Sequence, residues 1–167
     1  NQRIQESTIN LLDTSSTDDS TIDVYSYFSS SAKIAWNSAY ELAKQDNAQL
    51  PHAGHLLRAL LEDPDVKTLC LRLGIHYENL ARQIPDYSKS TTFADTQELL
   101  AIPFEAFEEA HALHSKTISP LMLMCALASQ LPTEHPIQKL LYRFDISRDS
   151  IEIVSQWIFN FDVLIDD

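Results

Sequence analysis

Glycine is the residue that this chain lacks most clearly, with two copies in 167 residues. Hairpin turns, phosphate-binding loops and dinucleotide-binding folds depend on glycine, because they need positive backbone φ angles or a position without a Cβ atom. The scarcity of glycine therefore argues against these structures. Long windows rich in Ala, Leu, Glu, Gln and Lys favour helix instead, and the apolar content of 44% is that of a globular protein. We expect an all-α fold.

Basic residues are also scarce, since 12 Lys and Arg stand against 24 Asp and Glu, and the formal net charge is −12. A surface of this sign repels the phosphate backbone of nucleic acids and disfavours docking on anionic membranes. We therefore expect no nucleic-acid partner and no direct membrane contact. Basic or hydrophobic protein partners remain compatible with this charge.

Cysteine is rare as well, and both copies, Cys70 and Cys125, lie within apolar helical runs. Cysteine in such runs usually behaves as a small buried hydrophobe. Their placement indicates neither a disulfide nor a metal site, which predicts a reducing, cytoplasmic location. No apolar run has the length of a membrane span, and no signal peptide is present. The chain does not begin with Met, so we expect a fragment of a longer protein.

What the chain does contain is an internal repeat, because residues 28–84 match residues 99–155 in their apolar positions. Equivalent residues of the two copies are 71 positions apart in the first and third matched groups and 67 positions apart in the middle group. This difference predicts a shorter first loop and a longer second loop in the second copy. The groups are Trp36, Ala39 and Leu42 with Phe107, Ala110 and Leu113; Leu56, Ala59 and Leu60 with Leu123, Ala126 and Leu127; and Val66, Leu69, Leu73 and Ile75 with Ile137, Leu140, Phe144 and Ile146. Such a pattern is typical of a duplicated structural unit. We predict two pseudo-symmetric four-helix repeats that pack together as one eight-helix domain.

The segments outside the repeats are of a different character. Residues 1–26 are predicted to be a polar leader or linker and residues 159–167 a C-terminal tail or linker, on either side of a folded domain over residues 27–158. The polar stretch 86–96 is expected to join the copies, and the first helix of the second copy to begin near Pro103. The residues expected at helix ends are Ser29 to Ser31, Gly74, Ser119, Thr133 and Ser147.

Several short motifs follow one another in the same order in the two copies. The first copy has Phe28 followed by serines, Ala39-x-x-Leu42-Ala43, His55-Leu56-Leu57-x-Ala59-Leu60-Leu61 and Leu69-x-x-x-Leu73-Gly74-Ile75. The second copy has Ala110-x-x-Leu113, Ile118-Ser119-Pro120, Leu123-Met124-x-Ala126-Leu127 and Leu140-x-x-x-Phe144-Asp145-Ile146. Together they resemble the Clp N-terminal repeat. The resemblance implies a substrate- or adaptor-recruiting N-terminal domain of a Clp/Hsp100 AAA+ unfoldase, with unfolded proteins or an adaptor protein as partners. The alternative is a stand-alone accessory subunit that docks on a Clp protease ring.

Two departures from the family pattern limit what the resemblance implies. Members commonly carry Glu just before the His of the second helix, where this chain has Gly54 and, in the second copy, Leu121. In some relatives those glutamates help to bind phosphorylated arginine, so that activity is not expected here. The chain also lacks the Gly-x-x-x-x-Gly-Lys-Ser/Thr motif of a nucleotide-binding loop. We therefore expect a binding domain that is not an enzyme and has no cofactor, with any hexamer formed by AAA+ modules outside this chain.

Histidines at helical spacing raise the alternative of a metal site. Glu108 and His111 have the Glu-x-x-His spacing of di-iron bundles, and His114 follows three residues later. The first copy lacks matching ligands, so a solvated helix face is favoured and no metal is expected. His52 and His55 have the same spacing, and there a structural role as a helix cap or a bond between helices is favoured over catalysis.

The seam between the copies is the best candidate for partner binding. Phe93, Leu99, Ile102 and Phe104 lie at or beside the junction, in a segment whose helical periodicity is weak. Apolar residues in such a place are often simply core. Exposed apolar patches, however, usually mark binding sites, so we predict that these four residues line a groove for a peptide or an adaptor.

Overall fold

The computed structural model describes residues 23–48, 50–85 and 93–156, and over residues 93–98 it describes the backbone alone. The elements are η1 (Val24–Tyr27), α2 (Ser30–Gln45), α3 (Ala53–Leu60), α4 (Pro64–Arg72), α5 (Tyr77–Arg82), α6 (Phe93–Ala112), α7 (Pro120–Gln130) and α8 (Pro136–Arg143), and residues 148–156 are also helical. The expected all-α fold is confirmed. Within the described ranges, no helix combines the length and the apolar content that crossing a membrane would require.

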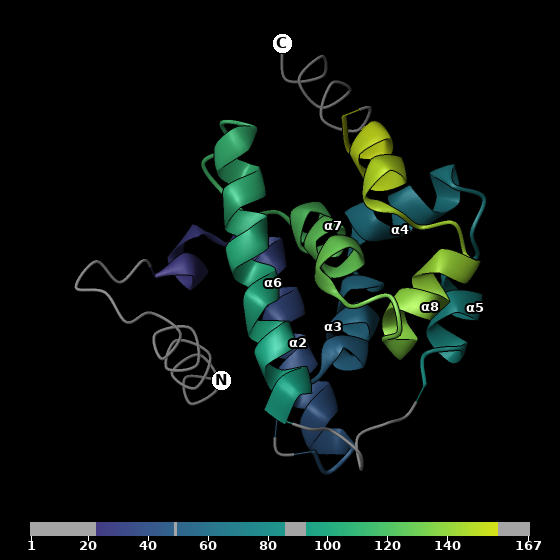
Figure 1. Ribbon diagram of the computed structural model, residues 1–167. Coiled ribbons are helices and arrows are strands. Elements are labelled where there is room, and N and C mark those ends of the chain that lie inside the picture. The colour runs from purple at the N-terminus through teal and green to yellow at the C-terminus, as the bar shows by residue number, and fades with distance from the viewer. Residues whose placement is uncertain (1–22, 49, 86–92, 157–167) are drawn as a thin grey trace.

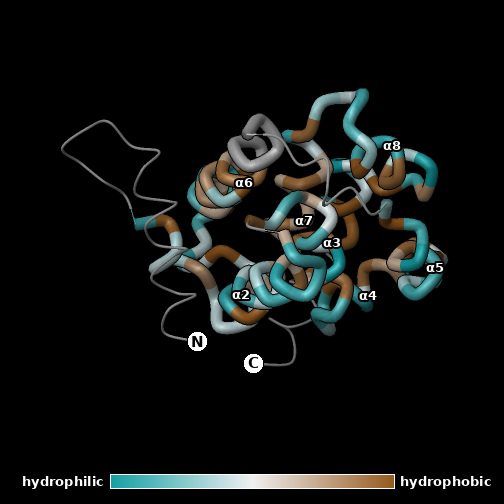
Figure 2. Tube along the Cα trace, turned by 90° about the horizontal axis from the view of Figure 1, so that it is seen from below, coloured by the Kyte–Doolittle hydropathy of each residue, from teal (hydrophilic) through white to brown (hydrophobic). Residues whose placement is uncertain are grey.

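Helices α3 and α7 lie at the centre of the domain, and the other helices surround them (Figures 1 and 2). Seven of the eight residues of α3 are buried, and α7 is apolar around nearly its whole circumference. Helix α7 contacts α2, α3, α4 and α6. Helices as short as these are unstable alone in water, so packing of their apolar sides is what stabilises them.

Polar residues begin several helices in the way that the sequence predicts. Ser29 Oγ accepts a hydrogen bond of 3.1 Å from the backbone N–H of Ala32, and Ser119 Oγ accepts one of 3.3 Å from the N–H of Met122. Ser147 Oγ likewise accepts the N–H three residues further on, at 3.2 Å. Each oxygen satisfies a backbone donor that has no partner inside the helix. The three predicted N-caps are confirmed.

Two other predicted helix starts are wrong. Helix α6 begins at Phe93, so Pro103 lies inside it rather than at its first turn. The missing N–H of a proline weakens a helix interior, but Pro103 is buried here and its packing offsets that loss. Helix α8 is capped by His135, whose Nδ1 accepts the N–H two residues on at 3.1 Å, and not by Thr133. Pro136 occupies the first helical position, which makes the residue directly before it the cap.

The structure also corrects the alignment of the two repeats. A residue with a left-handed backbone stands two positions after each of these helices, Asn47 with φ of 59° after α2 and His114 with φ of 54° after α6, which places the first helices 67 residues apart rather than 71. The same shift superposes their inner faces. Ala32, Ala35, Trp36, Ala39, Tyr40 and Ala43 of α2 fall on Leu99, Ile102, Pro103, Ala106, Phe107 and Ala110 of α6, all of them buried or partly buried.

The corrected alignment changes which loop differs between the copies. The connections 46–52 and 113–119 have seven residues each, so the predicted shorter first loop is wrong. The extra residues of the second copy lie between its second and third helices, as predicted. From there on the copies are 71 residues apart, and Gly74, with φ of 73°, matches Asp145, with φ of 56°.

Because Gly74 and Asp145 are equivalent, substitutions at the two positions test directly whether this place in the fold requires a left-handed backbone. A side chain at Gly74 meets nothing within 4 Å, so only its left-handed backbone opposes substitution. We expect Gly74→Ala to lower the free energy of unfolding by about 1 kcal/mol. Asp145→Gly should raise or leave unchanged the same quantity, because glycine relieves the strain. Urea unfolding followed by circular dichroism checks both, and a stabilising Gly74→Ala would contradict the assignment.

The chain before α2 ties the two repeats together. Phe28 forms a parallel bridge with Ile118, in which Ser29 N–H donates to Ile118 O at 2.9 Å and Ile118 N–H donates to Tyr27 O at 2.8 Å. Val24 is fully buried, so the packed part begins earlier than the predicted residue 27. Residues 1–22 of the predicted leader (1–26) and the predicted tail over 159–167 lie outside the described residues.

Candidate functional site

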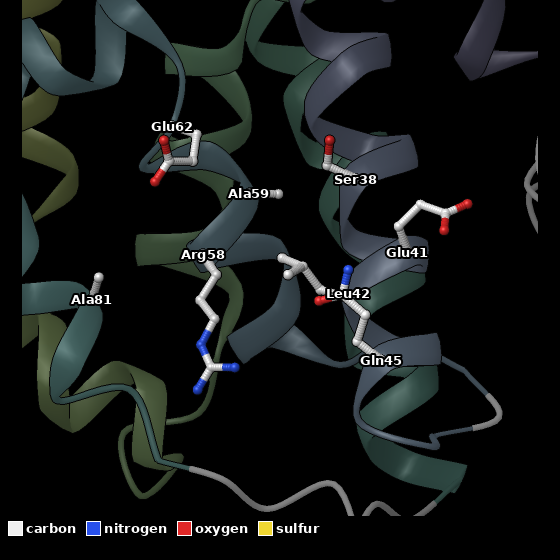
Figure 3. Close-up of a pocket in the computed structure, with 8 residues that line it drawn as sticks. All are labelled: Ser38, Glu41, Leu42, Gln45, Arg58, Ala59, Glu62 and Ala81. Atoms are coloured by element: carbon white, nitrogen blue, oxygen red, sulfur yellow. The ribbon is translucent and has the colours of Figure 1, made fainter.

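Helices α2, α3 and α5 enclose an open groove on the first repeat, with a volume of about 420 Å³ (Figure 3). We call it groove one. Its lining residues are Ser38, Glu41, Leu42 and Gln45 from α2, Arg58, Ala59 and Glu62 from α3, and Ala81 from α5. Leu42, Ala59 and Ala81 form the aliphatic part of its lining, and the other five residues are polar or charged. Glu41 and Glu62 stand at opposite sides of it and point away from one another.

Arg58 is the basic residue of groove one, and an acidic residue at the end of α2 holds it. Asp46 Oδ2 lies 3.6 Å from Arg58 Nη1 and 2.9 Å from His55 Nε2. One carboxylate therefore fixes both the arginine of the groove and a histidine of the core. Arg58 therefore brings a positive charge to the groove that is paired with Asp46.

His52 and His55 make the cap that begins α3. The backbone N–H of His52 donates to His55 Nδ1 at 3.1 Å, and the N–H of Gly54 donates to His52 Nδ1 at 3.0 Å. Because Nδ1 of His55 accepts, its proton sits on Nε2 and points to Asp46. Both histidines are buried, and their ring centroids are 3.8 Å apart. The structural role predicted for them is confirmed.

This histidine cap explains why glycine stands at position 54. A Cβ atom there would lie 2.8 Å from His52 Cε1 and 3.0 Å from His52 Nδ1. The ring cannot move aside easily, because it is buried and packs against the tilted ring of His55. A glutamate at this position is therefore sterically incompatible with His52.

Gly54→Ala is accordingly expected to lower the free energy of unfolding by about 1–2 kcal/mol, although alanine is the better helix former. In a His52→Ser background the same substitution should be stabilising, because serine is smaller and still caps the helix. A double-mutant cycle measured by urea unfolding separates the gain from the helix propensity of alanine from the cost of its collision with His52. An equal effect of Gly54→Ala in both backgrounds would show that the collision is not what excludes a side chain.

The corresponding place in the second repeat contains an arginine. Arg148 lies 3.6 Å from Glu105 and 2.5 Å from Glu109, both on α6, and 2.9 Å from Glu152. Burial raises the pKa of Glu109, while the hydrogen bond from Arg148 lowers the pKa of Glu152. The guanidinium therefore joins the last helix to α6 through Glu105 and Glu109, and pairs with Glu152 on its own helix.

Cys125 lies beneath these charges. Possible ligand atoms of Glu109, Cys125 and Glu152 are all within 4.8 Å of one another. Burial, followed by the charge of Glu109, raises the pKa of Cys125 to about 12, so at neutral pH the residue is a thiol rather than a metal-binding thiolate. The cation that these carboxylates hold is Arg148. Cys70 and Cys125 are both free and buried.

The residues predicted to form the partner-binding seam lie mostly in the core. Leu99 and Ile102 are 2% and 0% exposed, and Phe104 is partly buried. The side chain of Phe93 lies outside the described residues. In this arrangement Leu99 and Ile102 pack inside the domain, so their contact with a partner stays a prediction and would require α6 to move.

The histidines considered for a metal site are exposed at the end of α6. Helix α6 ends at Ala112, and His114 has a left-handed backbone, so His111 and His114 do not share one helical face. With the corrected alignment, the first repeat has Lys44 and Asn47 at the equivalent positions.

Groove one was not predicted from the sequence. The predicted alignment of α2 with α6 was wrong by one helical turn, so it did not show which residues of the two repeats are equivalent at this place. For the Arg148 cluster of the second repeat, the sequence did contain an indication. Glu105 and Glu109, and likewise Arg148 and Glu152, are four residues apart and so share one face of a helix.

These features define the protein as a helical domain made of two similar four-helix repeats, α2–α5 and α6–α8 with residues 148–156. The family model described as the Clp repeat (R) N-terminal domain matches residues 27–130. The chain belongs to this family and is a Clp N-terminal domain of the Clp/Hsp100 type. The crystal structure of the Hsp104 N-terminal domain from Candida albicans has a similar fold, with a TM-score of 0.57 and 20% identity over 75% of this chain and 87% of that chain. A comparison with curated proteins finds no match.

Proposed function

We propose that this domain recruits unfolded protein substrates, or an adaptor that carries them, to a Clp-type ATP-dependent unfoldase. The observation that carries the proposal is the family match over residues 27–130, which spans the whole first repeat and continues into the second. The recruiting segment would be the domain over residues 27–158. Its partners would bind weakly and reversibly, so that they can pass to the motor.

The surface of the domain supports this role. The formal charge of −12 favours basic segments over nucleic acid, and groove one is an open site whose lining combines three aliphatic side chains with polar and charged ones. ATP hydrolysis and hexamer formation would belong to AAA+ modules outside this chain. The two reduced, buried thiols support a cytoplasmic location.

The test is a titration of the chain with an unfolded model protein, such as fluorescently labelled reduced and carboxymethylated α-lactalbumin. Native α-lactalbumin is the matched control. We expect saturable binding of the unfolded protein with a Kd on the order of 10–100 μM, and at least tenfold weaker binding of the native one. Failure to bind the unfolded form would overturn direct substrate capture.

A stand-alone subunit that docks on a protease ring is the second candidate, because some family members have that form. The reading frame around this chain separates the two. A nucleotide-binding motif downstream supports the unfoldase domain, and a stop codon soon after Asp167 supports the accessory subunit.

A further inference from the structure

The two most exposed large apolar side chains of the described residues occupy the same position in the two repeats. Leu71 of α4 is 76% exposed and Tyr142 of α8 is 81% exposed, and they are 71 positions apart, which is the offset of the third helices. A single exposed apolar side chain is ordinary on a protein surface. Here the same place on the third helix presents one in both repeats, so this face is a candidate contact surface.

An arginine follows each of these side chains, and it is not paired with a carboxylate. Arg72 and Arg143 are both exposed, and within the described ranges no acidic side chain lies at ion-pair distance from either. The chain has twice as many acidic as basic residues, so carboxylates are plentiful on it. Each third helix therefore presents an apolar side chain beside a positive charge that the described part of the domain does not neutralise.

Of these two helices, α8 is the more positive. It contains Lys139 and Arg143 and no acidic residue, whereas α4 also contains Asp65. Lys139 pairs with Glu134 at 3.1 Å, at an exposed site where such pairs are weak. The surface around Tyr142 is therefore the better suited of the two to a segment that combines apolar and acidic side chains.

The chain itself contains such a segment directly after the last helix. Residues 157–167 read Trp-Ile-Phe-Asn-Phe-Asp-Val-Leu-Ile-Asp-Asp, of which seven are apolar, three are aspartate and none is basic. Apolar side chains in this number cost free energy wherever water surrounds them. A surface that is both apolar and positively charged matches the composition and the charge of this segment.

The segment is long enough to return to α8. Only residues 144–147 separate the end of α8 from the last helix (Figure 1). The last helix, over residues 148–156, is about 13 Å long, and the six residues 157–162 span about 20 Å when extended. A segment that turns back along the last helix therefore brings Asp162 to the end of α8.

We propose that residues 157–167 fold back along the last helix and cover the outer face of α8. Their apolar side chains contact Tyr142 and Ile153, which is 64% exposed on the last helix, and their aspartates pair with Arg143. Because the segment is tethered beside this surface, its effective concentration there is high, and a weak contact suffices. The contact involves none of the residues of groove one and is independent of the recruiting function.

The first experiment removes charge from the segment and observes α8. In ¹⁵N–¹H spectra of the full chain, Asp162→Asn with Asp166→Asn should shift the amide signal of Arg143 and those of its neighbours in α8. The control, Asp18→Asn with Asp19→Asn, removes the same charge near the other end of the chain and should leave these signals in place. Unchanged α8 signals in the first variant, or equal shifts in the two variants, would overturn the proposal.

The second experiment changes the surface and observes the segment. Trp157 and Trp36 are the two tryptophans of the chain, and Trp36 is buried, so the other indole N–H signal reports on the segment. A soluble gadolinium chelate broadens such a signal more strongly when the indole is exposed to solvent. Tyr142→Ser with Arg143→Ser should increase the broadening of the Trp157 signal about twofold or more, because the apolar contact and the cation are both lost.

The matched control makes the same change at the equivalent surface of the first repeat. Leu71→Ser with Arg72→Ser should alter the broadening of the Trp157 signal by less than about a fifth, and circular dichroism checks that both variants keep their helices. Equal broadening in the two variants, or a wild-type signal as exposed as in urea, would overturn the proposal. So would an effect of the α8 pair that appears only at high protein concentration, because that result would assign the surface to the segment of a second copy.

Discussion

Replacing His55 with alanine is expected to lower the free energy of unfolding by about 3 kcal/mol. The substitution removes the 2.9 Å bond to Asp46 and the acceptor for the backbone N–H of His52. That N–H then lies buried without this acceptor, and a cavity replaces a side chain that is 1% exposed. The cost is large because both losses occur where α3 begins, at the centre of the domain.

Urea unfolding followed by circular dichroism measures this effect, and His76 supplies the matched control. His76 precedes α5, is exposed and makes no side-chain cap, so His76→Ala should change the free energy of unfolding by less than about 0.5 kcal/mol. Asp46→Asn should cost about 1 kcal/mol, because an amide oxygen still accepts from His55. Similar values for His55→Ala and His76→Ala would show that the capping bonds carry little stability.

Arg148→Met should lower the free energy of unfolding by about 2 kcal/mol at pH 7 and low salt. This value lies between those of exposed and buried ion pairs, because the Arg148 side chain is 43% exposed and that of Glu109 is 13% exposed. Methionine keeps much of the aliphatic stem, so the loss reports the charge. Three carboxylates would then face one another without their cation.

The pH dependence of this variant follows from Glu109. Burial already raises its pKa, and removal of Arg148 raises it further. A carboxyl group whose pKa is higher in the folded state than in the unfolded state stabilises the fold at low pH, and this contribution is lost as the pH rises through the folded pKa. The deficit of Arg148→Met should therefore shrink from pH 7 to pH 5, and also in 1 M NaCl.

Arg143→Met is the control for Arg148→Met. Arg143 is exposed at the end of α8, and the structure gives it no ion pair among the described residues. Its substitution should change the free energy of unfolding by less than about 0.5 kcal/mol, without a dependence on pH. A deficit of Arg148→Met that stays constant with pH and salt would instead indicate lost packing.

Local features explain what was predicted correctly about the fold. A serine before a helix satisfies free backbone N–H groups whatever surrounds it, so Ser29, Ser119 and Ser147 could be identified as caps without knowledge of the packing. Gly74 was identified in the same way, because a left-handed residue commonly ends a helix. The scarcity of glycine and the repeated apolar pattern were enough for the fold class.

The alignment of the first helices could not be obtained in this way. Apolar residues on a helix recur every three or four positions, so a shift by one turn leaves an almost equally good match. Leu42 and Leu113 were paired because both are leucines in an apolar helical pattern. In the structure Leu113 is 57% exposed and Leu42 is partly buried, so the two residues are not equivalent. Only the burial of each side chain and the matching positions of the helix ends show that the offset between the first helices of the two copies is 67 residues and not 71.

Composition, spacing and motif order are properties of the chain, so they were enough to predict a helical, duplicated and acidic domain related to the Clp N-terminal repeats. Which helix faces are buried, and where a groove lies between the helices, depends on how the helices pack. In the second repeat Arg148 pairs with glutamates from two helices, whereas groove one in the first repeat has Ser38, Leu42 and Ala81 at the positions of those glutamates. Residues so far apart in the chain act together only after packing has brought their helices into contact.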